Sequence, residues 1–202
     1  MQFVDFSKPS FLISLASIAF NPLAWNIVAR NEYRNKTITK LFGGSAKAGT
    51  YFLALMIFSF GILRDSLYHR ALSEQPSHPL LPNEVPFNLH LVVPILLFVV
   101  GQTLVITSTW ALGITGTFLG DYFGILMDHR VEGFPFNIIE NPMYVGSTLC
   151  FAATALWYEK PAGIFVTLWV HICYSIALRY EGPFTSMIYA NRASSQSDKK
   201  EN

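Results

Sequence analysis

The sequence predicts an all-α, polytopic integral membrane protein with three to five apolar helices. Of its 202 residues, 51% are hydrophobic and only 13% are charged, which is about half the charged fraction of an ordinary soluble domain. The charged residues gather between long apolar segments, as expected where the bilayer core excludes unpaired charge. We therefore expect a single integral-membrane domain over residues 1–193, followed by a polar tail at 194–202.

The first apolar segment runs from Pro9 to Ala29, but Asn21-Pro22 interrupts it. Its first half, Phe11 to Phe20, would be about 15 Å long as a helix, against a hydrocarbon core of roughly 30 Å. Two paths follow: a helix that kinks at Pro22 and continues, or a re-entrant segment that enters and leaves on one face. The pattern favours a kinked or re-entrant first segment.

The remaining apolar segments predict two crossing helices and a hairpin. Residues 48–63 and 90–112 are apolar and long enough for helices at or near the bilayer thickness. Residues 144–158 and 162–178 are each shorter, and Glu159-Lys160-Pro161 separates them. A hairpin of two short helices turning at Lys160-Pro161 suits this pattern better than one long helix, because a proline disrupts a helix interior.

Charge predicts the orientation in the membrane. The stretch Arg30–Lys47 has five basic residues against one acid, a net charge of +4, and short loops of this kind stay cytosolic. Successive crossings then place residues 68–88 in the lumen and both 113–141 and the C-terminus in the cytosol. The final residues Lys199-Lys200-Glu201-Asn202 resemble a dilysine retrieval signal, which predicts the endoplasmic reticulum membrane.

Two kinds of partner are not expected. A net charge of +1, without a basic stripe interleaved with aromatic residues, gives no indication of nucleic-acid binding. Cys150 and Cys173 lie inside apolar segments and lack metal-ligand spacing, so we expect them to pack between helices. His69 and His78 likewise have no ligand spacing, and no metal is expected.

The stretch Gly113–Gly146 predicts a functional site because it is too rich in polar and aromatic residues for a connector. Its glycines 113, 116, 120 and 124 recur at helical spacing, which a helix-packing face would also explain. Asp121 beside Tyr122 and Phe123, however, offers a cationic amine both a carboxylate and aromatic rings. Asn141-Pro142 then opens the next helix, where free N–H groups can receive an anionic group.

A second cluster, Arg179–Phe184, follows the last apolar segment. One interpretation is a helix end, with Gly182-Pro183 stopping the helix. If the predicted hairpin forms, Glu181 also emerges on the same membrane face as Asp121 and Tyr144. The sequence then predicts one site built from both clusters.

Several motifs carry a family resemblance. They are Phe20-Asn21-Pro22 with Trp25–Arg30, Gly116-Thr117-Phe118-Leu119-Gly120-Asp121-Tyr122-Phe123-Gly124-Ile125, Phe134–Asn137, Asn141–Thr148 and Tyr180–Thr185. With these motifs the chain resembles the phospholipid N-methyltransferases over nearly its whole length, from about Phe11 to Arg192. The resemblance implies methyl transfer from S-adenosylmethionine to the nitrogen of monomethyl- and dimethyl-phosphatidylethanolamine in the bilayer.

The resemblance also implies roles for residues. It implies that Asp121 accepts the ammonium proton or orients the amine, with Tyr122 and Tyr144 beside the headgroup. Glu181 and Asn141 would hold polar groups of the cofactor.

The family's cofactor motifs are changed in two places. A Gly-x-Gly motif on the third helix matches Val99-Val100-Gly101, and a Glu-Glu pair matches Glu181-Gly182. The resemblance implies that Gly101 admits the cofactor; Val99 would obstruct it if the first glycine let the nucleotide approach, and would be tolerated if that glycine only packed helices.

Three other functions remain open on the sequence. The looser Asn/His-Pro-x-Tyr element is shared with isoprenylcysteine carboxyl methyltransferases and with related sterol reductases that use a nicotinamide. A catalytically silent lipid-binding scaffold is the alternative from another class.

Overall fold

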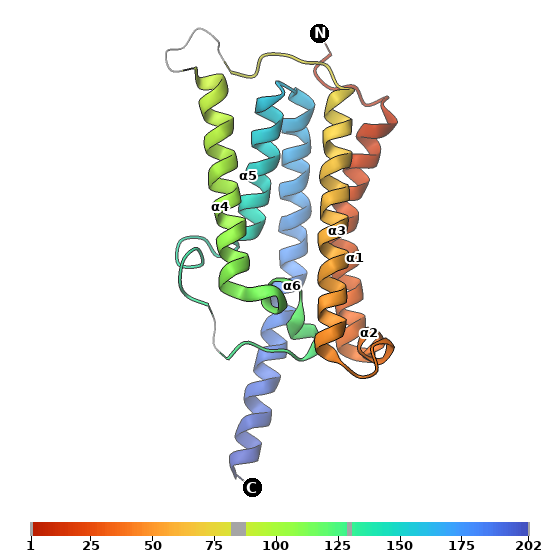
Figure 1. The fold of residues 1–202 in the computed structure, drawn as a ribbon, viewed down its shortest axis with the longest axis vertical. Helices are drawn as coiled ribbons and strands as arrows, with labels where there is room; N and C mark the ends of the chain where they lie inside the picture. Colours follow the sequence, from red (N-terminus) through yellow and green to blue (C-terminus); the bar gives the residue numbers. More distant parts are fainter. Residues whose placement is uncertain (1, 82–87, 129–130, 202) are drawn as a thin grey trace.

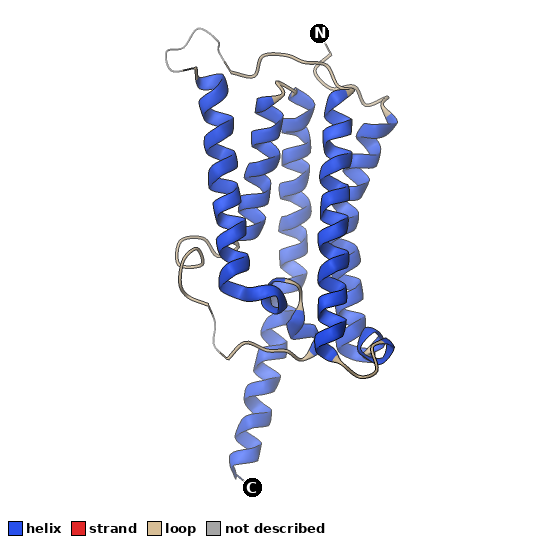
Figure 2. Cartoon of the chain, viewed as in Figure 1, coloured by secondary structure: helices blue, strands red, loops and turns tan. Residues whose placement is uncertain are grey.

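The protein is a bundle of long, nearly parallel helices, as a computed structural model shows for residues 2–81, 88–128 and 131–201, with side chains to 191 (Figures 1 and 2). Every element of secondary structure in these ranges is helical. The elements are α1 (Pro9–Asn35), α2 (Thr37–Leu41), α3 (Ala46–Ser73), α4 (Leu89–Thr117), the 3₁₀-helix η1 (Gly120–Phe123), α5 (Pro142–Trp157) and α6 (Pro161–Glu201).

Four segments of the described chain are long and apolar enough to cross a membrane: Pro9–Asn35, Ala46–Ser73, Leu89–Phe123 and Pro161–Asn191. The fifth, α5, has 16 residues and is about 24 Å long. It pairs with α6 through the tight turn at 158–160, so the predicted C-terminal hairpin is confirmed, but its second helix is not short, because α6 runs from Pro161 to Glu201. The predicted all-α membrane fold is confirmed with it.

The first segment is one continuous helix of 27 residues, so the re-entrant alternative is wrong. The helix runs through Pro22, and the amide of the neighbouring Asn21 bonds within the same helix. The Asn21 amide donates to the Ser17 carbonyl at 3.0 Å and accepts from the Trp25 indole at 3.1 Å. The polar atoms of the Asn21 side chain are thus satisfied within the helix itself.

The last helix also continues where the Gly182-Pro183 pair was a candidate stop, and that interpretation is wrong. A proline within a helix leaves nearby carbonyls short of donors. Here the Arg30 side chain of α1 donates to the Tyr180 carbonyl at 2.7 Å, and its guanidinium lies 4.6 Å from the Phe184 ring centroid. A neighbouring helix therefore supports α6 beside its proline.

The ends of the helices form two groups. The connection around α2, the segment that contains η1 and the C-terminal part of α6 share one end of the bundle, and the N-terminus lies at the other (Figure 1). The predicted orientation requires this grouping, because it places 30–47 and 113–141 on one side of the membrane. We call the two ends the basic end and the N-terminal end.

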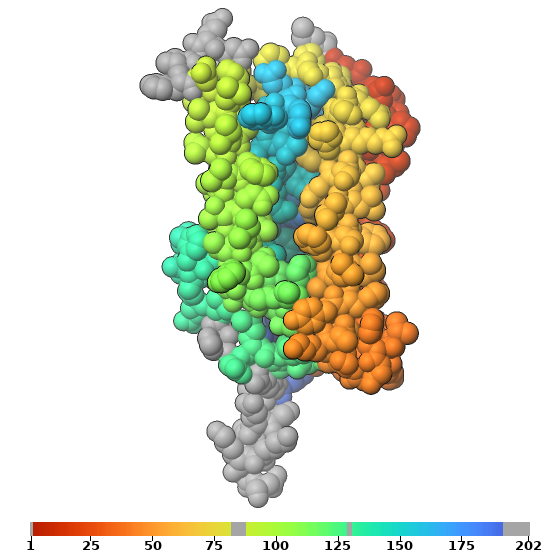
Figure 3. Space-filling view, in the orientation of Figure 1, coloured from red at the N-terminus to blue at the C-terminus, as the bar shows by residue number. Residues whose placement is uncertain are grey.

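Helices α4 and α5 approach each other closely through two glycines. A Cβ atom placed on Gly101 would lie 2.6 Å from the Gly146 carbonyl oxygen, and one placed on Gly146 would lie 2.5 Å from the Gly101 oxygen. Carbon and oxygen atoms do not approach so closely without bonding, so neither position has room for a side chain. As a result α4 packs on α5, and a furrow with α5 at its floor separates α4 from α3 (Figure 3).

Candidate functional site

A cavity of about 410 Å³ lies between α1, α3, α4, α5 and α6, nearer the basic end; we call it the central cavity. Ten of its lining residues are polar or charged, in a bundle whose other inner surfaces are mostly apolar. They are Asn21, Asn26, Arg64, Thr117, Glu140, Asn141, Tyr144, Ser147, Tyr174 and Glu181. Its size and its few converging polar groups are typical of a small-molecule site.

Two of the predicted clusters meet in this cavity through Tyr144 and Glu181. The Tyr144 hydroxyl, one turn into α5, donates to Oε2 of Glu181 on α6 at 2.6 Å. The Tyr144 ring also packs edge-on against the Tyr174 ring, with centroids 4.8 Å apart. Asn141, just before α5, lines the same cavity. The hairpin thus brings Glu181 to Asn141 and Tyr144, although Glu181 follows Tyr144 by 37 residues in the sequence.

Asp121 lies beside this cavity rather than in its wall. It stands on η1, and the Thr185 hydroxyl of α6 donates to its Oδ2 atom at 3.3 Å. Its predecessors Thr117, Phe118 and Leu119 do line the cavity. Asp121 is also close enough to Glu181 for the two carboxylates to repel each other.

Tyr122 is completely buried next to Asp121. Its ring stacks on the Phe184 ring, with centroids 5.1 Å apart and planes 9° from parallel. This stack fixes η1 against α6, so Tyr122 holds Asp121 in place from outside the central cavity.

The remaining predicted cofactor residues lie outside the central cavity. Val99 and Val100 are about half exposed on the outer side of α4, and Gly101 is packed against Gly146. Gly182 is exposed, and a side chain there would meet no atom within 4 Å. Their cofactor-binding roles stay predictions, because the structure contains no cofactor to test them.

The structure adds two cavity residues for which no role was predicted, although both lie within the family motifs. Among the described residues, Oδ1 of Asn26 and Oγ1 of Thr117 are buried without a hydrogen-bond partner, and both residues line the cavity. Buried polar atoms are almost always bonded, so these two indicate a ligand that supplies donors. In the sequence, the feature that indicates such a residue is a polar asparagine, Asn26, within an apolar segment.

The polar groups of the cavity fit S-adenosylmethionine. That molecule carries hydroxyl, amino and ammonium donors, and the cavity presents the Asn26 and Thr117 oxygens together with the Glu181 carboxylate. Only Oε2 of Glu181 has a partner within the described part of the chain, so Oε1 is free to accept a further bond.

Comparison with known proteins decides the family. The model of the family described as phospholipid methyltransferase matches residues 89–192, just over half of the chain. The chain belongs to this family. It is a phospholipid N-methyltransferase, and S-adenosylmethionine is its methyl donor, as the motifs predicted. The carboxyl methyltransferase, sterol reductase and silent scaffold alternatives are therefore set aside.

Relatives of this phospholipid methyltransferase match it over nearly its whole length. The phosphatidyl-N-methylethanolamine N-methyltransferase of Neurospora crassa is 58% identical, over 95% of this chain and 87% of its own. The enzyme of the same name from Saccharomyces cerevisiae is 53% identical, over 94% and 89%. The phosphatidylethanolamine N-methyltransferase of Homo sapiens is 42% identical, over 96% and 95%. No solved structure matches the chain.

Proposed function

We propose that this enzyme methylates the nitrogen of phosphatidyl-N-methylethanolamine and then of phosphatidyl-N,N-dimethylethanolamine, which gives phosphatidylcholine. The observation that carries the proposal is the central cavity, where Tyr144 and Glu181 face a space within the membrane bundle. Four fungal relatives between 52% and 58% identical bear the name of this activity. The basic end, with Arg30–Lys47, would face the cytosol, and Lys199-Lys200 predicts the endoplasmic reticulum as the membrane.

The reaction needs positioning and the removal of one proton. S-adenosylmethionine, when bound, would supply a methyl group carried on a positively charged sulfur. The rest of the cofactor then leaves as a neutral thioether. The substrate nitrogen attacks only in its neutral form, so the ammonium proton has to pass to an acceptor first. The nitrogen must then be held in line with the carbon–sulfur bond that breaks.

Tyr144 and Glu181 would provide the positioning. The Tyr144 ring lines the cavity and can contact a methylated amine, an interaction worth about 0.5–2 kcal/mol. Glu181 would accept bonds from the polar groups of the cofactor through its free Oε1 atom. The Tyr144 hydroxyl donates to Oε2 of the same carboxylate. Tyr144, beside the amine, would therefore also hold Glu181 in position for the cofactor.

Asp121 would accept the ammonium proton or orient the amine from the edge of the cavity. We expect Asp121→Asn to lower kcat about 100-fold with both substrates saturating, because proton transfer by a positioned group contributes about 10²–10⁴-fold. Turnover of the purified variant measures this. Asp128→Asn, an exposed position in the same segment, serves as the matched control and should retain activity. Full turnover by Asp121→Asn would remove Asp121 from the reaction.

The products of membranes given labelled S-adenosylmethionine test the proposed function itself. Membranes that contain the protein are expected to accumulate labelled phosphatidylcholine, and membranes without it are not. Supplying phosphatidyl-N-methylethanolamine should increase the label in this lipid. Label confined to protein, or absent from the lipids, would contradict the proposal.

A further inference from the structure

A second cavity, of about 610 Å³, lies between α3, α4 and α5 towards the N-terminal end; we call it the lateral cavity. Its walls are mainly apolar and include Pro94, Phe98, Phe151 and Trp157. Ile95, Phe98 and Trp157 line it and are nevertheless about half exposed, at 48%, 49% and 50%. The lateral cavity therefore opens sideways, along the furrow between α4 and α3 (Figure 3), where the bilayer would lie.

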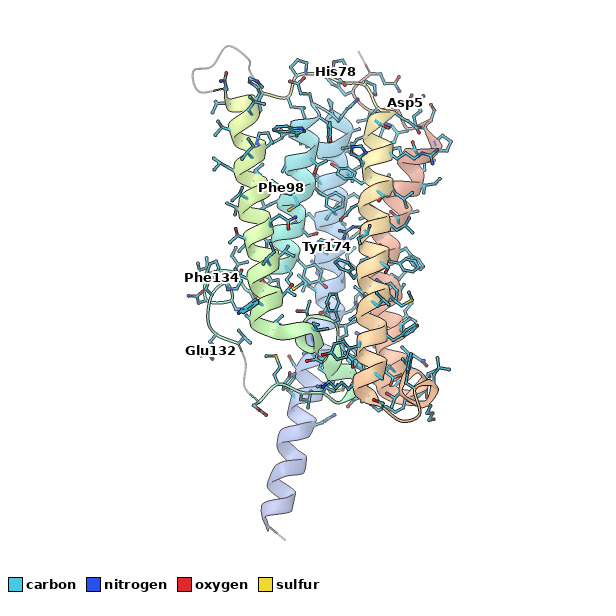
Figure 4. All side chains as sticks on the ribbon, viewed as in Figure 1. Asp5, His78, Phe98, Glu132, Phe134 and Tyr174 are labelled. Atoms are coloured by element: carbon cyan, nitrogen blue, oxygen red, sulfur yellow. The ribbon has the colours of Figure 1, made fainter. Side chains whose placement is uncertain are left out.

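The lateral and central cavities adjoin each other. Arg64, Val105 and Ser147 line both of them. The hydroxyl groups of Tyr174 and Ser147 are hydrogen-bonded at 3.3 Å. Tyr174 lies midway along the bundle, at this junction (Figure 4). A ligand can thus extend from the side of the bundle to Tyr144 and Glu181 without crossing a helix.

The junction of the two cavities contains a positive charge. Arg64 of α3 bonds the Asp65 carboxylate through Nε at 2.9 Å and Nη2 at 2.7 Å, and its Nη1 donates to the Tyr174 hydroxyl at 2.6 Å. The Arg64 side chain is only 16% exposed, whereas that of Asp65, which also lines the lateral cavity, is 59% exposed. An ionised side chain within a membrane bundle is costly and usually serves a function.

The Arg64 guanidinium has donors to spare. Three of its five N–H groups are used by Asp65 and Tyr174, and within the described residues the other two have no partner. Both belong to the terminal nitrogens, whose planar arrangement matches two oxygens of a phosphate group. Its aromatic neighbour Phe151, 5.1 Å from the guanidinium carbon, holds the group in position.

We propose that Arg64 binds the phosphate of the phospholipid substrate, which enters sideways between α3 and α4 with its acyl chains in the lateral cavity. The proposal rests on the proposed function. A phospholipid carries its amine, phosphate, glycerol and acyl chains in that order, with two carbons between amine and phosphate. The protein presents the matching order: Tyr144 and Glu181, then Arg64, then an apolar cavity open to the bilayer.

The direction of this path agrees with the predicted orientation. The Glu181 side of the central cavity lies towards the basic end, and the lateral cavity lies towards the N-terminal end. A lipid of the leaflet at the basic end has its headgroup on that side and its chains pointing to the other. The substrate therefore needs no inversion to reach the site.

The first experiment compares two substrates in purified enzyme. One is phosphatidyl-N-methylethanolamine, and the other is a diacylglycerol ether of N-methylethanolamine, which lacks the phosphate. We expect Arg64→Gln to raise the KM for the phospholipid about 10- to 100-fold, the effect of losing a charge-assisted bond, and to leave the KM for S-adenosylmethionine unchanged. The phosphate-free substrate should be methylated equally by both forms of the enzyme.

Two further variants separate phosphate binding from a structural role of the ion pair. Arg64→Lys keeps the charge and should recover part of the phospholipid affinity. Arg70→Gln, on the same helix but exposed and paired with Glu74, should behave as the unchanged enzyme. An equal loss on both substrates in Arg64→Gln would show that Arg64 only holds α3 to α6, and would overturn the proposal.

A photolabelling experiment tests the binding path without requiring turnover. A phosphatidyl-N-methylethanolamine with a photoactivatable acyl chain should label Ile95, Phe98 and Trp157, and unlabelled substrate should compete at these positions but not at Leu96 and Ile106 on the outer side of α4. Arg64→Gln should abolish the competed labelling. If unlabelled substrate competes with labelling but the enzyme does not methylate the lipid, only the proposed function is overturned. If the enzyme methylates the lipid but unlabelled substrate does not compete with labelling, only the binding path is overturned.

Discussion

Glu181→Gln is expected to raise the Kd for S-adenosylmethionine about 10- to 100-fold. Glu181 is held by the Tyr144 hydroxyl through Oε2, and its Oε1 atom is available to the cofactor. Glutamine has nearly the same shape and can still accept one bond, so the loss reports the charge. Hydrogen bonds to a charged group contribute about 1.5–3 kcal/mol, which corresponds to that change in affinity. Equilibrium binding to protein in detergent, without lipid substrate, measures it.

Two companion variants make the result specific. Tyr144→Phe removes the hydroxyl that orients Glu181 but leaves the charge, so we expect a smaller rise in the same Kd. Glu132→Gln changes an exposed acid that lies on the outside of the bundle (Figure 4), and should leave the Kd unchanged. Unchanged affinity in Glu181→Gln would place the cofactor elsewhere, and kcat would then show whether Glu181 serves the amine.

Local chemistry made much of this site predictable. The hairpin at Lys160-Pro161 follows from the charged pair and the proline that separate two apolar segments, although the second helix continues well past residue 178. Once it forms, Glu181 must emerge on the side where α5 begins, and the structure shows the resulting bond between Tyr144 and Glu181. The family motifs were informative for the same reason, because most of them lie around this junction.

Contacts between distant helices were not predictable from local patterns. Prolines at 22 and 183 are ordinary breaking points, yet both helices continue, and Arg30 of a neighbouring helix bonds the Tyr180 carbonyl beside Pro183. In the sequence Arg64 directly follows the apolar segment 48–63. Its place between two cavities depends on the spacing of α3 and α4, which no single segment encodes.

Gly101 has a packing role in the structure, beside the cofactor role that the family resemblance implies. The family resemblance implies that it admits the cofactor, yet in the structure its Cα faces the Gly146 carbonyl at the α4–α5 crossing. Small residues permit this approach of membrane helices, and a larger one forces them apart. Val99 is tolerated in the same helix because it lies on the outer side, about half exposed.

Gly101→Ala is therefore expected to destabilise the protein even without cofactor. The new methyl group would lie 2.6 Å from the Gly146 oxygen and 2.8 Å from Cys150 Sγ, and backbone at a helix crossing cannot yield as a side chain can. Overpacking of this kind costs about 1–3 kcal/mol, so we expect a lower melting temperature in detergent and a lower folded yield. Gly101→Val should prevent folding.

Gly61→Ala is the matched control for Gly101→Ala, because Gly61 is also within an apolar helix but has open space around its Cα. There alanine should leave the melting temperature unchanged or raise it, since alanine favours helix more than glycine does. If Gly101 only admitted the cofactor, the cofactor-free melting temperature of Gly101→Ala would equal that of the unchanged protein, and only the Kd would rise. A fall in the cofactor-free melting temperature instead assigns Gly101 to helix packing, which leaves Glu181 and the central cavity to account for cofactor binding.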